Sequence, residues 1–363
     1  MLRIPFGRLG ALALISASLL ASLGAPTTAR AAARAHPAKA AITSASAIST
    51  AATLSASAAG KVAAIEAAPA PGFYRFMLGS FAITALSDGK RPINAHMLSN
   101  ISEQEVDQTL AGAGQANPVP SSFNAFLIDT GSKLVLIDTG AGALWGPQLG
   151  KLGEQLQLAG YAAEQVDEIY LTHMHSDHIG GLMDGDSLRF PHAIVRASKA
   201  EADYWLSPAR LEQAADKDKG SFRNAQNALR AYIANERFLS FEPGAELAPG
   251  IRAVASEGHT AGHSTYLVES AGQKLLVWGD MLHIAAIQFG QPGATMRFDY
   301  DGGAAVSVRR QVLQAAARDG LLVAGAHLPF PGIGKVVARE DGFAWQPQLI
   351  DQATAANRPA QAK

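Results

Sequence analysis

The chain has 363 residues and a nearly balanced charge, with 31 acidic and 30 basic side chains and a formal net charge of −1 at pH 7. This balance provides no basic surface for a phosphate backbone and argues against nucleic acid as a substrate or partner. The chain has no cysteine, which excludes thiolate metal ligands, redox pairs and cysteine nucleophiles.

Residues 1–31 have the pattern of a secretory signal peptide. Arg3 and Arg8 form a basic start, residues 9–23 are apolar and small, and an Ala-Arg-Ala sequence ends at Ala31, where we place the cleavage. The apolar stretch is too short to span a bilayer comfortably, which argues against stable membrane insertion; an uncleaved anchor is the alternative. No twin-arginine motif is present, so we expect general secretion and an exported protein, either periplasmic or secreted.

Residues 32–71 form a tract rich in Ala, Ser, Thr and Pro that has no aromatic side chain. Such a tract cannot bury enough apolar surface to offset the conformational entropy lost on ordering, so we interpret it as a linker. Residues 72–350 are then the folded part, a length that fits one large domain or two small ones, and we favour one. Residues 351–363 are expected to be a flexible tail.

The folded part alternates hairpins with helices. Residues 126–138 and 266–280 each predict two apolar strands joined by a polar, glycine-containing turn. Helical patterns lie at 147–158, 199–205, 302–318 and, as a charged insertion, 207–238. Ser198 and Glu201 predict a capping box at the start of the second helix. Two similar halves indicate an α/β fold of two packed β-sheets with helices on both outer faces; the alternative is that the hairpins only reflect a β-rich chain.

The segment 171–181, Leu-Thr-His-Met-His-Ser-Asp-His-Ile-Gly-Gly, concentrates ionisable groups between a predicted strand at 167–172 and a helix expected to begin at Ile179. Burying so many imidazoles and carboxylates costs free energy unless they are paired or bind metal. Imidazole nitrogen and carboxylate oxygen are the ligands of zinc and similar divalent ions. We therefore predict a metal site rather than a polar surface loop, with these candidate ligands: His173, His175, Asp177 and His178.

Three further predicted strands end in side chains that can bind metal. A strand at 251–255 leads to Gly-His-Thr-Ala-Gly-His at 258–263, a strand at 274–278 leads to Asp280, and one at 321–326 leads to His327. A rigid scaffold can aim side chains at strand ends and in the following loops toward one point. Each of these residues alone would be ordinary, but four strands ending in this way predict one shared site.

Together, the motifs His-x-His-x-Asp-His, Gly-His-Thr-x-Gly-His and Gly-Asp, followed by a late histidine, resemble those of the metallo-β-lactamase superfamily over nearly all of residues 73–340. Within it the chain is similar to the group of methyl parathion hydrolases and lactonases, through segments such as Ala-Asp-Tyr-Trp-Leu-Ser at 202–207 and Ala-His-Leu-Pro-Phe-Pro-Gly-Ile-Gly at 326–334. The resemblance implies the αββα sandwich of the metallo-β-lactamase fold, with a two-metal site in the cleft between the sheets.

The resemblance also implies a ligand set, and all seven of its positions are filled. One ion would be bound by His173, His175 and His259. The second would be bound by Asp177, His178 and His327, and Asp280 would bridge the two ions. The intact set argues against a member that has lost its metals and serves as a binding module. We expect two divalent ions, zinc in the first place, with cobalt or manganese as alternatives.

Two ions about 3.5–4 Å apart would hold a shared hydroxide, which would be the nucleophile of a hydrolytic reaction. Asp280 is the best protein candidate for handling the proton and is therefore predicted to be catalytic as well as a ligand. Asp138 and His263 are expected to orient the metal-binding histidines; capping of strand ends is the alternative for both.

Related enzymes line the mouth of the site with aromatic side chains, which match Trp145, Trp205 and Phe222 here; the alternative is that these three belong to the core. His283 and Phe298 are further candidates for contact with the substrate. Organophosphate hydrolases of the group have an aliphatic residue in place of His283 and a smaller residue in place of Phe298. These two departures favour a carboxylic ester as substrate, such as a lactone, over a phosphotriester.

The leading hypothesis is a binuclear metal-dependent hydrolase that cleaves lactones or esters of small molecules, with promiscuous phosphotriesterase activity. The alternative is a dedicated organophosphate hydrolase of the methyl parathion type. Thioester hydrolysis of the glyoxalase II type is a weaker alternative, because the C-terminal part has no obvious basic cluster for glutathione. The sequence does not define the oligomeric state, and a homodimer stays open.

Overall fold

The computed structural model describes residues 72–348. The predicted domain, 72–350, contains all of them, whereas the predicted signal peptide (1–31), linker (32–71) and tail (351–363) lie outside the described residues. Within the described part of the chain, no helix is both long enough and apolar enough to cross a membrane.

The first sheet has seven strands in the order β1-β2-β4-β5-β6-β9-β10. Strands β1, β2, β4 and β5 pair antiparallel, and β5, β6, β9 and β10 run parallel to one another. The strands are β1 (Phe73–Leu78), β2 (Phe81–Ile93), β4 (Val119–Asp129), β5 (Leu134–Ile137), β6 (Glu168–Tyr170), β9 (Ile194–Ser198) and β10 (Phe238–Phe241).

The second sheet also has seven strands, in the order β11-β12-β13-β14-β16-β17-β18, and only the pair β14 and β16 is parallel. The hairpins predicted at 126–138 and 266–280 are confirmed as β4–β5 and β13–β14. The strands are β11 (Glu246–Ala248), β12 (Ile251–Ala255), β13 (Ser264–Ser270), β14 (Gln273–Val277), β16 (Leu322–Ala324), β17 (Ile333–Arg339) and β18 (Gly342–Pro347).

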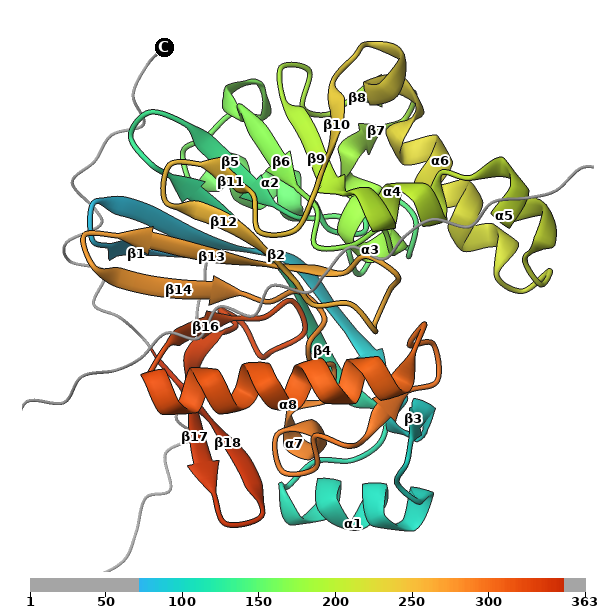
Figure 1. Ribbon diagram of the computed structural model, residues 1–363, viewed down its shortest axis with the longest axis vertical. Helices are drawn as coiled ribbons and strands as arrows, with labels where there is room; N and C mark the ends of the chain where they lie inside the picture. Colours follow the sequence, from blue (N-terminus) through green and yellow to red (C-terminus); the bar gives the residue numbers. More distant parts are fainter. Residues whose placement is uncertain (1–71, 349–363) are drawn as a thin grey trace, which may run out of the picture. The chain divides into compact units, whose positions relative to one another are not determined.

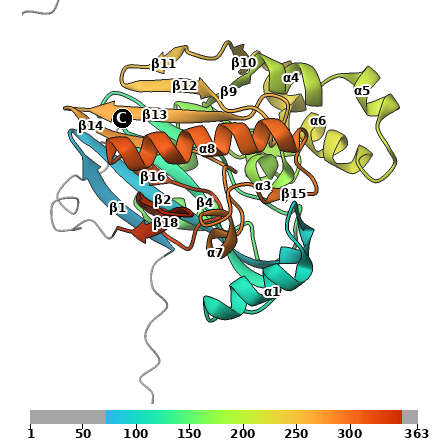
Figure 2. The ribbon, with the colours of Figure 1, turned by 60° about the horizontal axis from the view of Figure 1, so that its bottom comes forward.

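Helices and two small ribbons complete the described chain. The ribbons pair β3 (Leu98–Ser99) with β15 (Thr295–Met296), and β7 (Met183–Asp184) with β8 (Ser187–Leu188). Figure 2 shows α1 beside β15 and α7, with which it shares a small apolar cluster. The helices are α1 (Glu103–Gly112), α2 (Leu152–Leu158), α3 (Ser176–Ile179), α4 (Lys199–Trp205), α5 (Pro208–Gln213), α6 (Lys219–Ala234), α7 (Ala285–Gln288) and α8 (Gly302–Asp319).

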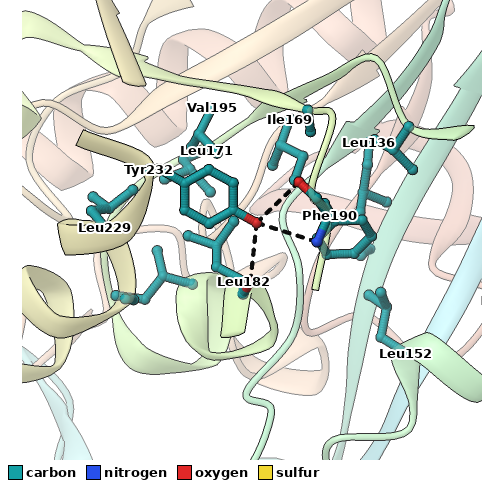
Figure 3. Packing of buried hydrophobic residues seen from close by; sticks show 14 of the residues in the cluster. Leu136, Leu152, Ile169, Leu171, Leu182, Phe190, Val195, Leu229 and Tyr232 are labelled. Atoms are coloured by element: carbon teal, nitrogen blue, oxygen red, sulfur yellow. Dashed lines mark hydrogen bonds between the residues drawn. The ribbon is translucent and has the colours of Figure 1, made fainter. Parts of the chain in front are cut away.

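Three apolar clusters define the layers. Phe76 and Ile128 of the first sheet pack against Val268 of the second, so alternate side chains fill the space between the sheets. The outer face of the first sheet is covered by α2 and α6, and that of the second by α8 (Figure 1). In the outer layer of the first sheet, the Tyr232 hydroxyl donates to the Leu182 carbonyl oxygen at 3.0 Å (Figure 3). The predicted αββα sandwich is therefore confirmed.

Element boundaries differ from the prediction at three places. The helical insertion expected at 207–238 forms two helices, α5 and α6, and its last residue, Phe238, begins β10. The helix expected at 147–158 begins only at Leu152, because Gly150 has a positive φ of 81° that ends the preceding turn. The helix expected to begin at Ile179 instead ends there, and α3 is followed by a 3₁₀ turn at 180–182. The glycines after α3 pack against backbone carbonyls, which leaves no room for side chains in this turn.

Asp88 fixes the loop that carries Trp145. Its buried carboxylate accepts hydrogen bonds from the backbone N–H groups of Ala141, Gly150 and Leu152, at 2.9–3.0 Å. The loop therefore closes around one side chain from β2, and its Ala141 and Leu149 pack with Phe123 in a small apolar cluster.

We expect Asp88→Ala to lower the free energy of unfolding by about 3 kcal/mol, because it leaves three backbone donors without their charged acceptor. Urea unfolding followed by circular dichroism measures the change. Asp186→Ala, which removes an exposed carboxylate in the turn between β7 and β8, is the matched control and should change the free energy by less than about 0.5 kcal/mol. Equal effects of the two variants would contradict this role for Asp88.

Candidate metal centre

Loops that follow strands of both sheets converge on one site. His173 follows β6, and Asp177 and His178 lie in the short helix α3 beyond it. His259 lies in the loop between β12 and β13, Asp280 follows β14, and His327 follows β16. Sequence reasoning placed these residues at strand ends, and the fold brings all seven predicted ligands together.

The first group of ligand atoms comes from three imidazoles and one carboxylate. His173 Nε2 lies 3.0 Å from His175 Nδ1, which in turn lies 3.1 Å from His259 Nε2. Asp280 Oδ2 lies 3.6 Å from His173 Nε2 and 3.4 Å from His259 Nε2. Donors bound tetrahedrally to one zinc ion at about 2.0–2.1 Å would be roughly 3.4 Å apart, so this spacing fits a single cation.

The second group shares Asp280 with the first. His178 Nε2 lies 3.1 Å from Asp280 Oδ1 and 3.5 Å from Asp177 Oδ2. His327 Nε2 lies 3.1 Å from Asp280 Oδ2 and 3.4 Å from Asp177 Oδ2. Each oxygen of Asp280 therefore faces a different set of imidazoles.

Unpaired atoms test whether the group fits a cation. His178 Nε2 and Asp280 Oδ1 are buried and face each other, yet neither has a hydrogen-bond partner among the described residues. Buried polar atoms normally find such partners, and an atom without one needs an explanation. A lone pair on each atom directed at a common cation accounts for this contact, so the residues fit divalent metal ions.

Charge supports the same assignment. Burial alone would raise the pKa of Asp280, but the surrounding histidines, His178 and His327 foremost, hold it well below its usual range. Burial also opposes protonation of His327, yet Asp280 and Asp177 raise its pKa to about 9. The two carboxylates thus attract positive charge into a buried site, and a metal cation held by neutral imidazoles can supply it.

Outer contacts of the imidazoles turn their lone pairs inward. His178 Nδ1 donates to Asp138 Oδ2 at 2.8 Å, and His259 Nδ1 donates to Asp299 Oδ1 at 2.7 Å. Thr172 Oγ1 donates to Asp138 Oδ2 at 2.7 Å and lies 3.1 Å from His173 Nδ1. A proton on the outer nitrogen leaves the inner nitrogen free to bind metal, so Asp138 orients ligands of both groups.

His263 has a different partner from the one expected. Its Nε2 accepts a hydrogen bond from the backbone N–H of Asp280 at 3.1 Å, and its Nδ1 lies 2.9 Å from Ser256 Oγ. It therefore positions the shared carboxylate through the main chain rather than orienting a metal-binding histidine. Its ring is buried beside His173, with centroids 5.2 Å apart.

Glu201 connects the two main ligand loops. Its buried carboxylate accepts from the Met174 N–H at 2.8 Å, the Gly262 N–H at 2.8 Å and Trp205 Nε1 at 2.6 Å. Thr260 Oγ1 adds a fourth hydrogen bond at 2.8 Å. The predicted capping box is therefore only half formed: the Ser198 hydroxyl caps α4, but the Glu201 side chain turns to the ligand loops.

The predicted substrate residues fall into two classes. Trp145, His283 and Phe298 line a cavity of about 400 Å³ beside Asp280, and Trp145 and Phe298 are 36% and 43% exposed. Trp205 and Phe222 are only 7% and 3% exposed and belong mainly to the apolar cluster under α6, which is the alternative stated for them. They also border a second cavity, of about 590 Å³, beside His175 and His259.

His283 lies in direct contact with the shared carboxylate. Its Nε2 is 3.0 Å from Asp280 Oδ2, and its ring stacks on that of His327 with centroids 5.0 Å apart. Its Nδ1 is buried and has no hydrogen-bond partner within residues 72–348. Phe298 packs edge-on against His283, with ring centroids 5.3 Å apart, and so partly covers it.

Three residues of the site were missed from the sequence in these roles. Asp299 holds His259, Glu201 joins the loops, and Phe123 packs edge-on against His327 with centroids 4.8 Å apart. No sequence motif marks Asp299 or Phe123, and the position of Glu201 is explained equally well by a helix-capping role. Only tertiary placement separates these roles from ordinary ones.

Comparison with known proteins decides the family. The family model described as Metallo-beta-lactamase superfamily matches residues 120–327, more than half of the chain. The chain belongs to the metallo-beta-lactamase superfamily. Two probable metallo-hydrolases, from Mycobacterium tuberculosis and Mycobacterium bovis, are each 27% identical in an alignment of 180 residues that covers 44% of this chain. The chain spans only 56% of the length of these two relatives.

Solved structures resemble the whole described domain. A hydrolase named AbOPH, of the beta lactamase superfamily, is 32% identical with a TM-score of 0.75, over 78% of this chain and 99% of its own. AidC, a dizinc quorum-quenching lactonase in complex with the product N-hexanoyl-L-homoserine, is 27% identical with a TM-score of 0.72, over 77% and 98% of the two chains. The chain therefore shares the superfamily and the fold of these hydrolases, and its described residues form a site that could hold metal ions.

We expect Glu201→Gln to lower the free energy of unfolding by about 2–4 kcal/mol, because an amide NH₂ would face donors that now share a carboxylate. The melting temperature should fall by several degrees and zinc affinity should fall with it, since both ligand loops lose their common anchor. Calorimetry and competition with a chelating dye measure the two effects. Glu212→Gln, on the exposed face of α5, is the control and should change neither. A stable Glu201→Gln with normal zinc affinity would contradict this anchoring role.

Proposed function

We propose that this protein hydrolyses the ester bond of small lactones or esters with two divalent cations, zinc in the first place. The observation that carries the proposal is the pair of ligand groups that meet at Asp280, open to a cavity of about 400 Å³. His173, His175 and His259 would hold one cation, and Asp177, His178 and His327 the other. When bound, such a pair polarises a carbonyl oxygen and lowers the pKa of the attacking water.

The chain's own groups would hold and move the proton. Asp280 Oδ2 lies between His283 and His327, at 3.0 and 3.1 Å, and is the acidic group nearest to both. It would accept the proton released as water adds to the carbonyl. His263 keeps this carboxylate in place through the backbone N–H, so the acceptor does not need to reorganise during the reaction.

The cavity favours a flat acyl centre over a bulky one. Ile93, Phe123 and Trp145 form an apolar wall beside Asp177 and His327, while Phe298 and His283 crowd the space over Asp280. A planar carbonyl needs little room around the electrophile, whereas a tetrahedral phosphorus with two alkoxy groups needs more. AidC, a dizinc lactonase with 27% identity to this chain, lends further support.

The same crowding speaks against a dedicated organophosphate hydrolase of the methyl parathion type, which stays the alternative. Phosphotriester cleavage would then be a promiscuous activity. Thioester hydrolysis of the glyoxalase II type stays the weaker alternative, because the C-terminal part of the sequence has no obvious basic cluster for glutathione. We further propose that the protein is exported to the periplasm or secreted, on the basis of residues 1–31 alone. The formation of a homodimer stays an untested prediction.

Purified protein should contain about two divalent ions per chain, as measured by elemental analysis. Chelation should abolish ester and lactone hydrolysis, and zinc, cobalt or manganese should restore it. Melting temperature serves as the control, because restored stability without restored activity would separate a structural ion from a catalytic one. Full activity of demonstrably metal-free protein would contradict the mechanism.

Replacing both His283 and Phe298 with leucine should raise the ratio of phosphotriesterase to lactonase kcat/KM by about tenfold, which corresponds to about 1.4 kcal/mol of differential transition-state binding. The reason is relief of crowding over Asp280. Methyl parathion and dihydrocoumarin are suitable test substrates. Phe238→Leu, in β10 and away from the cavities, is the control. A ratio that stays within about twofold would remove the main support for lactones over phosphotriesters.

A further inference from the structure

The cleft over the ligand groups has two arms that meet at Phe298. The apolar arm, of about 400 Å³, is lined by Ile93, Phe123 and Trp145. The second arm, of about 590 Å³, extends over α4 and α5 and has a different lining. Four side chains line both arms: His175, Lys217, Ser221 and Phe298. The apolar arm also reaches Asp280 and the second arm His259, so a substrate held at the ligand groups can extend into each of them.

The second arm combines aromatic and cationic side chains. Tyr204 and Tyr300 pack edge to face with ring centroids 5.1 Å apart, and the Arg210 guanidinium carbon lies 4.8 Å from the Tyr204 ring centroid. Arg297 enters from the segment after β15, where its backbone N–H donates to the Met97 carbonyl oxygen at 2.9 Å. Arginine side chains stacked on aromatic rings keep their donor edges free for a ligand.

The positive charge of this arm is not neutralised locally. Across residues 72–348, no carboxylate oxygen lies within 4.0 Å of the guanidinium nitrogens of Arg210 or Arg297. Two carboxylates do line the arm, but both are engaged. Asp218 lies 3.0 Å from Lys217 Nζ, and Asp299 is buried against His259 at 2.7 Å.

We propose that the second arm binds a carboxylate carried by the substrate at a distance from the scissile ester, with Arg297 and Arg210 as its partners. The preferred substrate is then an ester or lactone with an apolar group on one side of the reacting carbonyl and an anionic group on the other. This inference rests on the proposed ester hydrolysis and narrows its substrate class. The planar fork of a guanidinium matches a carboxylate in two parallel hydrogen bonds, which gives direction as well as attraction.

A matched pair of substrates tests the inference: 4-nitrophenyl hydrogen glutarate, which is anionic, and its methyl ester, which is neutral. For the zinc-loaded protein at low salt, the ratio of kcat/KM for the anionic ester to that for the neutral one should be about tenfold or more, equivalent to about 1.4 kcal/mol. The double variant Arg297→Gln with Arg210→Gln should bring this ratio close to one, mainly through a higher KM for the anionic ester. Arg297→Lys should keep part of the preference, because it keeps the charge but loses the fork.

Two arginine substitutions separate local binding from general attraction. Arg91 lies over Trp145 in the apolar arm, 5.2 Å from the ring centroid, and Arg230 lies on the exposed face of α6. The double variant Arg91→Gln with Arg230→Gln removes two positive charges, as the test variant does, and should leave the ratio as in the parent protein.

A ratio near one for the parent protein, or an equal fall with the double variant Arg91→Gln with Arg230→Gln, would overturn the carboxylate site. Failure to hydrolyse either ester would instead count against the proposed function, and with it against this inference.

Discussion

The shared carboxylate of Asp280 is the constraint on which the rest of the site depends. Each of its oxygens faces a different set of imidazoles at about hydrogen-bond distance, and one such contact, to His178, has no hydrogen-bond geometry. Burying a carboxylate of this kind costs several kcal/mol of free energy unless positive charge is held close to it. The loops around it must therefore be held to within a fraction of an ångström, and buried acidic side chains do so: Asp138 orients imidazoles of both groups, and Glu201 ties the two ligand loops together.

The convergence of the seven candidate metal ligands could be predicted because such side chains are costly to bury without a metal and because they lie at the ends of apolar strands. The αββα architecture followed from alternating hairpins and helices. Other features depend on contacts that local sequence does not encode. Glu201 fits a helix cap, yet its carboxylate accepts hydrogen bonds from two loops distant in sequence, through the N–H groups of Met174 and Gly262. Asp299 reaches His259 only because β15 pairs with β3 and positions the loop after it. Asp88 likewise accepts from the N–H of Leu152 at the start of α2, a contact with β2 that adds to the local effect of Gly150.

The aromatic residues show how one residue type serves two purposes. Trp145 and Phe298 are partly exposed and border the cavity over Asp280, whereas Trp205 is mostly buried and donates its indole N–H to Glu201. Trp205 thus supports the ligand loops from behind while its ring packs edge-on against His175. The cleft joins an apolar wall to a cationic one across the metal ligands, and this asymmetry would orient a substrate before any bond is broken.

Anomalous scattering from crystals of the zinc-loaded protein tests the central claim most directly. The account predicts two zinc peaks about 3.5–4 Å apart, with Asp280 bonded to both. One peak should lie among His173, His175 and His259, and the other among Asp177, His178 and His327. A single peak, or two peaks of which only one touches Asp280, would contradict the shared carboxylate as the organising feature of this site.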